Sequence, residues 1–222
     1  MGLRKRAVND AQKNERRETI LRAALQSFNE GSYDAVKIES VAKQAGIAKG
    51  TVYLYFRTKE ELFLALNERA WIEWFTELNR RLRKEHYPTS IPRIVGLFAD
   101  TLAERPEFLR LIAILHTTLE QNVPADTWLA FKRTLRDGML ESGKLLEQKL
   151  DFLKDGEGAV LFVRIQALII GLQHLASPPA NAADALEEHE LSLFRVDLAG
   201  ALRETLTVLF MGLKARGKAP GR

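Results

Sequence analysis

The stretch that most constrains the fold of this chain is residues 37–69, KIESVAKQAGIAKGTVYLYFRTKEELFLALNER. Its apolar residues recur at intervals of three and four on both sides of Gly46, which is the pattern of two short amphipathic helices joined at a glycine. We expect a first helix over residues 37–44 and a second over residues 49–55. This arrangement is typical of a helix-turn-helix, whose second helix fits the major groove of DNA.

The second helix of this motif has an inward and an outward side. Val52 and Phe56 are spaced to face the core. Lysine and backbone amides bind phosphates, threonine contacts base edges or thymine methyl groups, and tyrosine hydroxyls reach backbone oxygens. Glycine lets the start of the helix approach the DNA backbone. We therefore expect DNA contacts from the residues on or beside the outward side: Lys49, Gly50, Thr51, Tyr53, Leu54 and Tyr55.

The segment GIAKGTVYLYFRTKEELF, residues 46–63, resembles the signature of the tetracycline-repressor-like (TetR/AcrR) family of bacterial transcription regulators. The similarity extends upstream and covers residues 15–70. It implies an N-terminal helix-turn-helix domain, a C-terminal helical domain with a ligand cavity, and a dimer formed by the last two helices. It also implies that Lys59 contacts a DNA phosphate and that the loop holding Tyr33 lies near the DNA backbone.

The chain departs from the family pattern where the two short helices begin. The family usually has threonine or serine near Val36 and Lys37, and serine or threonine at the position of Ala48. We expect both side-chain caps to be absent here, at a cost of about 1 kcal/mol each, and Lys37 to meet a phosphate by its charge instead. Thr58 and Glu61 have the spacing of a capping box, which predicts that a new helix begins after Thr58.

Charge is concentrated at the N-terminal end of the chain. Residues 1–59 hold 12 basic and 6 acidic side chains, whereas the remainder holds 21 basic and 23 acidic ones. A basic end on a nearly neutral body predicts that a polyanion binds at that end. We read residues 1–13 as a mobile basic arm, partly helical near its end, that is either a solvated tail or, through the cluster Arg4, Lys5 and Arg6, a contact to a minor groove or to phosphates.

Helical periodicity continues through the rest of the chain, and no strand pattern or repeat accompanies it. We expect an all-α protein of about nine helices, with a DNA-binding domain over residues 1–58 that includes the arm, and an effector-binding and dimerisation domain over residues 59–222. The further helices are predicted over residues 15–30, 59–84, 91–103, 106–119, 126–153, 158–176 and 191–214. The helix over 59–84 has an unbroken pattern, so it joins the two domains.

The predicted helix over residues 158–176 is apolar nearly all round, so it should be buried on more than one side. A partner subunit is the natural cover for the second side, which supports a homodimer through the last two helices. Four polar side chains interrupt the apolar stretch and argue against a membrane span: Arg164, Gln166, Gln173 and His174. The N-terminal residues lack the apolar run of a signal peptide, so we expect a cytoplasmic protein.

Catalytic chemistry has little support in this sequence. The chain has no cysteine and four histidines, and no zinc-protease, phosphate-loop or nucleophile-elbow motif is present. His116 and Glu120 are one helical turn apart and are the nearest approach to a metal or acid–base pair. We expect no catalytic residue, no metal site and no cofactor.

The ligand cavity implied by the resemblance needs apolar residues with a few polar anchors. The candidates are Phe98, Ile112, His116, Trp128, Phe131, Phe162, Gln166 and Ile169. Each of them is equally compatible with an ordinary helical core. His116 and Gln166 are the stronger candidates, because a buried polar group requires a partner.

Together these features predict a dimeric, sequence-specific DNA-binding transcription regulator. We expect a repressor that a small, mostly apolar effector releases from a near-palindromic operator. One alternative is a DNA-binding protein that organises the nucleoid without an effector. The other is an all-helical enzyme or binding protein whose basic end is incidental, which an absence of salt-sensitive DNA binding would favour.

Overall fold

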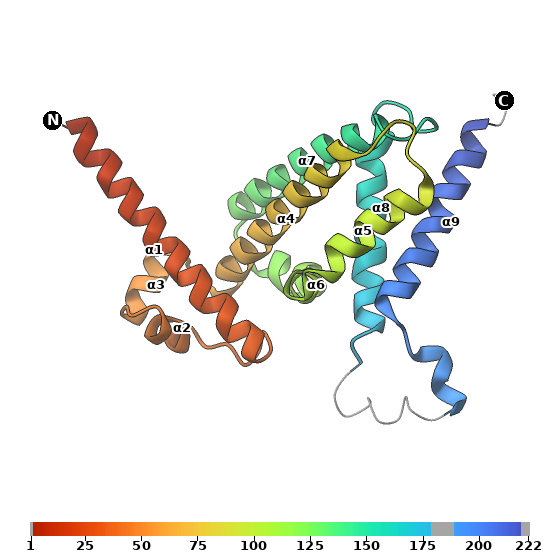
Figure 1. The fold of residues 1–222 in the computed structure, drawn as a ribbon. Coiled ribbons are helices and arrows are strands. Elements are labelled where there is room, and N and C mark those ends of the chain that lie inside the picture. Colours follow the sequence, from red (N-terminus) through yellow and green to blue (C-terminus); the bar gives the residue numbers. More distant parts are fainter. Residues whose placement is uncertain (1, 179–188, 219–222) are drawn as a thin grey trace. The chain divides into compact units, whose positions relative to one another are not determined.

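The computed structural model describes residues 2–178 and 189–218 (Figure 1). In these residues the chain forms nine α-helices and no strand, as predicted. They are α1 (Gly2–Glu30), α2 (Ile38–Gln44), α3 (Lys49–Tyr55), α4 (Lys59–Lys84), α5 (Ile91–Ala103), α6 (Pro106–Ala113), α7 (Ala125–Glu147), α8 (Glu157–Leu175) and α9 (Leu198–Lys218). Residue contacts divide the chain into two compact units. We call Met1–Glu68 with Leu115–Phe131 the head, and Arg69–Ile114 with Lys132–Arg222 the body.

The head has a core built by the apolar stripes of its short helices. Ile20 and Leu21 of α1, Val41 of α2 and Val52 of α3 are fully buried, and Phe63 of α4 is buried beside them in the same unit. The predicted inward stripes of these helices are therefore confirmed.

The first helix starts much earlier than predicted. α1 begins at Gly2 rather than at Glu15, so the arm expected over residues 1–13 is helical from residue 2 onward and not only near its end. This segment lacks proline and contains alanine, arginine, lysine and glutamine, which have high helix propensity even without an apolar face. The side chains of residues 1–10, including the predicted basic cluster, lie outside the described set.

The body has an aromatic centre. Rings from five of its helices contact one another: Trp71, Trp74, Phe75, Phe98, Phe108, Phe162 and Phe210. The centroids of Trp71 and Phe108 are 5.0 Å apart and those of Phe98 and Phe162 are 5.5 Å apart. All seven side chains are at most 5% exposed. Edge-to-face and offset pairs of this kind add stability beyond the buried area alone.

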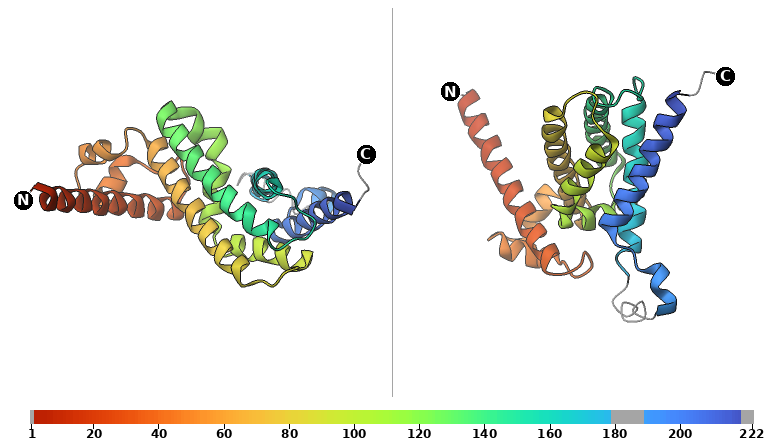
Figure 2. Two further views of the ribbon diagram at one scale, coloured as in Figure 1. Left: turned by 90° about the horizontal axis from the view of Figure 1, so that it is seen from above. Right: turned by 45° about the vertical axis from the view of Figure 1, so that its right-hand side comes forward.

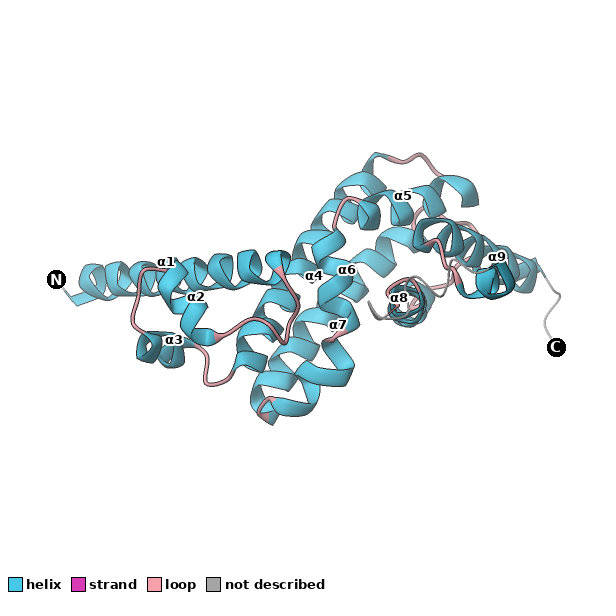
Figure 3. Ribbon diagram, turned by 90° about the horizontal axis from the view of Figure 1, so that it is seen from below, coloured by secondary structure: helices cyan, strands magenta, loops and turns pink. Residues whose placement is uncertain are grey.

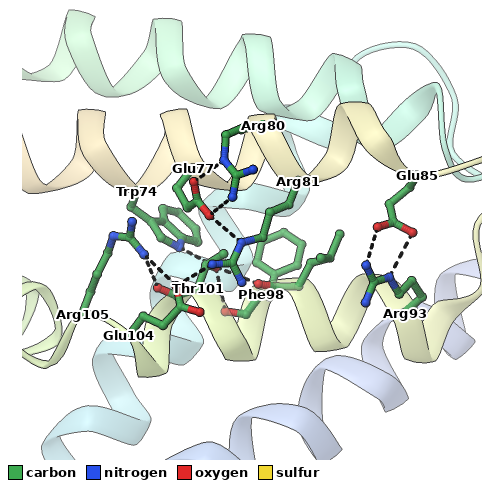
Figure 4. A network of polar contacts seen from close by, with 11 residues as sticks. Trp74, Glu77, Arg80, Arg81, Glu85, Arg93, Phe98, Thr101, Glu104 and Arg105 are labelled. Atoms are coloured by element: carbon green, nitrogen blue, oxygen red, sulfur yellow. Dashed lines mark hydrogen bonds and ion pairs between the residues drawn. The ribbon is translucent and has the colours of Figure 1, made fainter.

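Polar contacts join α4 to α5 at the edge of this aromatic cluster (Figure 4). The indole Nε1 of Trp74 donates to Oγ1 of Thr101 at 3.1 Å. Glu77 accepts two hydrogen bonds from Arg80 and one from Arg81, each at 2.6 Å, and Arg81 also reaches Glu104. The basic run at the end of α4 is thus partly neutralised by carboxylates.

Helices α7 and α8 approach each other closely through glycine. A Cβ atom on Gly143 would lie 2.4 Å from the amide nitrogen of Ala159, and one on Gly158 would lie within 2.2 Å of the carbonyl oxygen of Gly143. α7 ends at Glu147, earlier than the predicted end at residue 153. The backbone after it is held by the loop that follows α4, because the amide of Thr89 donates to the carbonyl of Lys149 at 2.8 Å.

The segment after α6 is less regular than predicted. α6 ends at Ala113, and a π-helical turn (Leu115–Leu119) and a short 3₁₀ turn (Glu120–Asn122) replace the helix predicted to residue 119. The side chains of Gln121 and Asn122 donate to the carbonyls of His116 and Thr118, and so compete with regular helical pairing.

The C-terminal part contains α8 and α9, which run side by side (Figures 1 and 2). The helix predicted over residues 191–214 is instead a 3₁₀ segment (His189–Phe194) followed by α9 from Leu198. Asp197 sets this start, since its carboxylate accepts from the amide of Gly200 at 3.0 Å. Phe194 in the 3₁₀ segment is 58% exposed. Most of the stretch between the predicted helices over 158–176 and 191–214, and residues 219–222, lie outside the described residues.

Helix α8 is long and apolar enough to cross a membrane by composition alone. Core helices of water-soluble proteins share that composition. α8 packs against α6 and α9. It buries Leu161, Phe162, Ile165 and Ile169 within the body. Figure 3 shows α8 among the helices of the described residues. Packing within the body therefore covers one side of α8, while Val160, Val163 and Leu175 on the same helix remain exposed.

Candidate nucleic-acid interface

The helix-turn-helix forms as predicted. α2 is followed by a turn in which Gly46 adopts a left-handed φ of 66°, a conformation that side chains with a Cβ rarely adopt. The amide of Ile47 donates to the carbonyl of Ala42 at 3.0 Å and closes this turn. α3 then begins at Lys49 and ends at Tyr55, the predicted bounds.

The two short helices begin without side-chain caps. The N-cap residues are Lys37 for α2 and Ala48 for α3, and neither side chain bonds a helical amide. α4 is different, because Oγ1 of Thr58 accepts from the amide of Glu61 at 3.1 Å and the Glu61 carboxylate accepts from the amide of Arg57 at 2.6 Å. The predicted capping-box pair thus fixes the start of α4.

The outward side of α3 is open to solvent. Val52 and Phe56 anchor the helix with exposures of 0% and 4%, whereas Tyr53 is 44% and Leu54 82% exposed. Leu54 is apolar and largely exposed to solvent, so its side chain can contact a thymine methyl group. The predicted DNA-binding residues all belong to the head: Lys37, Lys49, Gly50, Thr51, Tyr53, Leu54, Tyr55 and Lys59. Among them Thr51, Tyr55 and Lys59 are half-buried.

A cluster that sequence reasoning did not assemble lies at the start of α4. The Tyr33 hydroxyl donates to Oε1 of Glu60 at 2.8 Å, and the Lys59 ammonium lies 4.0 Å from the centroid of the Tyr33 ring. Burial and the neighbouring carboxylates of Glu60 and Asp34 raise the pKa of Tyr33 well above its ordinary value. Burial favours a higher pKa for Glu60, but the Tyr33 hydrogen bond, other donors and Lys59 together hold that pKa below its ordinary value.

Lys49 also has an acidic neighbour. Its ammonium lies 4.0 Å from a carboxylate oxygen of Glu39 on α2, and both side chains are exposed. An exposed pair at this distance contributes little stability. Lys49 therefore remains available for a phosphate, and Glu39 places a hydrogen-bond acceptor beside it.

The head also contains an open cleft of about 510 Å³. It is lined by residues from α1, from the end of α3 and the start of α4, and from the first turns of α7, including Arg17, Tyr55, Glu68 and Phe131. Oγ1 of Thr127 lies 3.4 Å from Oε1 of Glu61, the residue that caps α4. The segment around α7's start thus contacts the same residue that fixes the beginning of α4.

The predicted effector-binding residues divide between the two units. Five belong to the body, where Phe98, Ile112, Phe162 and Ile169 are at most 1% exposed and Gln166 is 8% exposed. The other three, His116, Trp128 and Phe131, belong to the head.

His116 differs from its prediction as a buried anchor. Its side chain is 43% exposed, and its Nδ1 lies 3.3 Å from Oε2 of Glu120. The irregular turn after α6 rotates this residue away from the stripe that a continuous helix would form. The same carboxylate oxygen accepts from Nε1 of Trp128 at 3.1 Å, so the three side chains form one polar cluster.

The body has a groove of about 300 Å³ between the second half of α4 and the middle of α7. It is lined by apolar and polar residues together, among them Phe75, Thr76, Asn79 and Gly138. Phe75 is also a member of the aromatic cluster, where its ring contacts the ring of Phe162. In the described residues, no group of three or more His, Asp or Glu side chains is placed to bind a metal ion.

Comparison with known families places both parts of the chain in one family. Residues 20–66 match the model described as bacterial regulatory proteins, tetR family, and residues 68–217 match the tetracyclin repressor-like C-terminal domain. The uncharacterized HTH-type transcriptional regulator YhgD of Bacillus subtilis is 47% identical over 49 residues, which are 22% of this chain and 26% of that protein.

Two further relatives are named as repressors. The HTH-type transcriptional repressor NicS of Pseudomonas putida is 27% identical over 133 residues, 56% of this chain and 62% of NicS. The matched segments thus span less than two thirds of either curated relative. The solved structure of SmeT, the repressor of the Stenotrophomonas maltophilia efflux pump SmeDEF, shares the fold with a TM-score of 0.52 and 22% identity, covering 92% of this chain and 96% of SmeT.

The exposed recognition helix and the helical body thus agree with two family models, of which the second alone matches more than half of the chain. The chain belongs to the tetracycline-repressor-like (TetR) family of bacterial transcription regulators.

Proposed function

We propose that this chain is a homodimeric repressor that binds a near-palindromic operator through α3 and is released by a small, mostly apolar effector. The observation that carries the proposal is the outward side of α3, where Tyr53 and Leu54 are exposed while Val52 and Phe56 hold the helix in the head core. Members of this family are transcription regulators, so we assign no catalytic step, and we place the protein in the cytoplasm where such regulators meet DNA.

The DNA contacts divide into two classes. We assign Lys37, Lys49, Tyr53, Tyr55 and Lys59 to phosphates, which fix position without reading sequence. Thr51 and Leu54 are assigned to base edges and thymine methyl groups, and Gly50 allows the helix start to approach the backbone, since no atom lies within 4 Å of the site of an added Cβ. A dimer places two such helices in successive major grooves, about 34–36 Å apart or at a related spacing.

Dimerisation is proposed through α8 and α9. Both helices expose large apolar side chains while burying others in the body. On α8 these are Val160, Val163 and Leu175, and on α9 Val208 and Met211, each at least 50% exposed. Exposed apolar side chains concentrated on two adjacent helices are typical of a subunit interface.

The effector is proposed to bind in the body beside the aromatic cluster. The groove lined by Phe75 offers the entry, and Phe98, Phe162, Gln166 and Ile169 lie in the same unit. Because Phe98 and Phe162 are fully packed against other rings, the effector must displace an aromatic side chain to enter. α4 contributes residues to both units, so we propose it as the lever between effector and DNA. The effector can shift the equilibrium between the DNA-binding and the released conformation only by the difference in its binding free energy for the two.

The test begins with selection of duplexes from fragmented genomic DNA by the purified full-length protein. We expect enrichment of near-palindromic sites upstream of genes, tight binding at moderate salt, and release by one member of a library of apolar metabolites. Binding of scattered sites without symmetry, and no release by any compound, would contradict the operator and effector assignments.

One observation favours the second candidate function, a nucleoid-organising protein without an effector. The interior positions that would line a ligand cavity are occupied by packed rings, with Phe98 and Phe162 at most 1% exposed. The two candidates differ in the number of genomic sites, which chromatin immunoprecipitation counts directly. A few promoter sites support the repressor, and hundreds of dispersed sites support the organiser.

A further inference from the structure

The loop between α1 and α2 contributes an aromatic residue directly beneath a cation. Tyr33 lies in this loop, and its ring centroid is 4.0 Å from the Nζ atom of Lys59, the first residue of α4. This distance is well inside the range of about 6 Å over which a ring face attracts a cation. Both residues belong to the head and both are half-buried.

Tyr33 is itself held on two further sides. Its hydroxyl donates to Oε1 of Glu60 at 2.8 Å. Its ring packs edge-to-face on Phe63, with centroids 4.9 Å apart and planes at 83°, and Phe63 is fully buried. The ring is therefore a fixed platform, anchored to the core on one side and to α4 on another.

A fixed platform restricts the long side chain above it. A free lysine loses side-chain rotamer entropy when it binds a phosphate, and a ring that already holds the ammonium reduces that loss. Burial holds the pKa of Lys59 below its ordinary value, and the charges of Asp34 and Glu60 oppose this shift in part. The Tyr33 hydroxyl also occupies one oxygen of Glu60, the carboxylate next to Lys59 in sequence.

We propose that Tyr33 is a positioning residue for DNA binding, whose ring holds the Lys59 ammonium in the orientation that meets a DNA phosphate. This inference rests on the proposed DNA-binding function and adds to it a residue that need not touch DNA. It explains why the loop at Tyr33 is packed against α4 by three different contacts.

The test is a double-mutant cycle on a fluorescent mixed-sequence duplex of about 30 base pairs, because a phosphate contact acts on any sequence. Tyr33→Leu should weaken binding about two- to fivefold. Lys59→Ala should weaken it further and lower the slope of log affinity against log salt by about 0.9. In the Lys59→Ala background, Tyr33→Leu should then have no further effect.

Two variants serve as controls. Tyr33→Phe keeps the ring face and the Phe63 contact, so it should bind DNA within about twofold of the unchanged protein, although it loses the Glu60 hydrogen bond. Lys43→Ala removes a different exposed lysine of the head, and its effect should add to that of Tyr33→Leu, since the two share no partner. Thermal unfolding midpoints check that each head remains folded.

Selective ¹³C labelling of lysine supplies a readout that does not depend on DNA. The ε-methylene protons of Lys59 should be shifted upfield by the Tyr33 ring current, and Tyr33→Leu should abolish that shift. An equal loss of affinity from Tyr33→Leu in both Lys59 backgrounds would overturn the inference, as would the absence of an upfield Lys59 signal. If the unchanged protein binds no duplex at any salt concentration, the proposed function itself fails, even where the ring shift is present.

Discussion

At the scale of single residues, Glu77 of the body accepts hydrogen bonds from two arginines. Hydrogen bonds from Arg80 and then Arg81, together with their charges, lower its pKa to about 2 despite the opposing effect of burial. An unfolded glutamate titrates near 4.3. The folded form therefore binds protons less readily, and the stabilisation by Glu77 is complete above about pH 4.5 and is lost as pH falls toward 2.

This leads to a prediction about acid stability. Glu77→Gln should lower the free energy of unfolding at pH 7 by about 1–2 kcal/mol, a value reduced for solvent screening of the partly exposed arginines. The difference from the unchanged protein should shrink between pH 4.5 and pH 2. Urea unfolding monitored by circular dichroism at several pH values measures the stability difference at pH 7 and its decrease at lower pH. A difference that is constant with pH would show that the carboxylate charge is not responsible.

Two glycines of the body allow a second prediction at this scale. Gly143→Ala should destabilise the protein by about 1–3 kcal/mol, because the new Cβ would collide with the α8 backbone and overpacking of this kind cannot relax locally. Gly96→Ala in α5 is the matched control, since the nearest atom to its Cβ would be 3.8 Å away. That change should be neutral or stabilising by up to about 1 kcal/mol. Equal unfolding midpoints for the two variants would refute the close helix approach.

At the scale of elements, α3 should separate the reading of sequence from the binding of phosphates. Tyr53→Ala and Lys59→Ala should weaken binding to operator and to random DNA by similar factors, because both remove backbone contacts. Thr51→Ala should weaken operator binding alone, by about 1–3 kcal/mol for a good base contact. Fluorescence anisotropy on both duplexes makes the comparison. Similar factors on the two duplexes for all three variants would mean that Thr51 reads no base.

The elements also show how far the sequence predicts this structure. The bounds of α3, the left-handed Gly46 and the capping of α4 by Thr58 and Glu61 were all predictable, because each depends on a local rule. The irregular turn after α6 was not, since it depends on side chains such as Gln121 and Asn122 that bond earlier carbonyls. The end of α7 escaped prediction for a related reason, because a distant loop binds the carbonyl of Lys149.

The candidate sites divide in the same way. The exposure of Tyr53 and Leu54 followed from helical periodicity within one short segment. The Tyr33 platform did not, because Tyr33 and Lys59 are brought together only when the loop after α1 folds onto α4. The predicted effector residues were chosen as one apolar set, yet the contacts assign them to two units. Spacing along the chain predicts a face of a helix but does not predict which other helix covers it.

At the scale of the whole molecule, operator binding should depend on the apolar faces of α8 and α9. Val163→Glu combined with Met211→Glu should convert the dimer to a monomer, because each change would bury charge in the proposed interface. Operator affinity should fall as the dimer is lost, whereas the circular dichroism spectrum should not change. Leu140→Glu on α7 is the control, since Leu140 is 52% exposed on a helix outside the proposed interface. Sedimentation that remains dimeric for the double variant would exclude this interface.

The placement of the three tryptophans has a practical consequence. Trp71 and Trp74 lie in the aromatic cluster of the body, while Trp128 lies in the head with its indole nitrogen bound to Glu120. Intrinsic fluorescence therefore supplies a separate natural label for each half of the molecule. A variant without Trp128 emits only from the body and reports on ligand binding there. A variant without Trp71 and Trp74 emits only from the head and reports on changes there, and neither variant needs an attached dye.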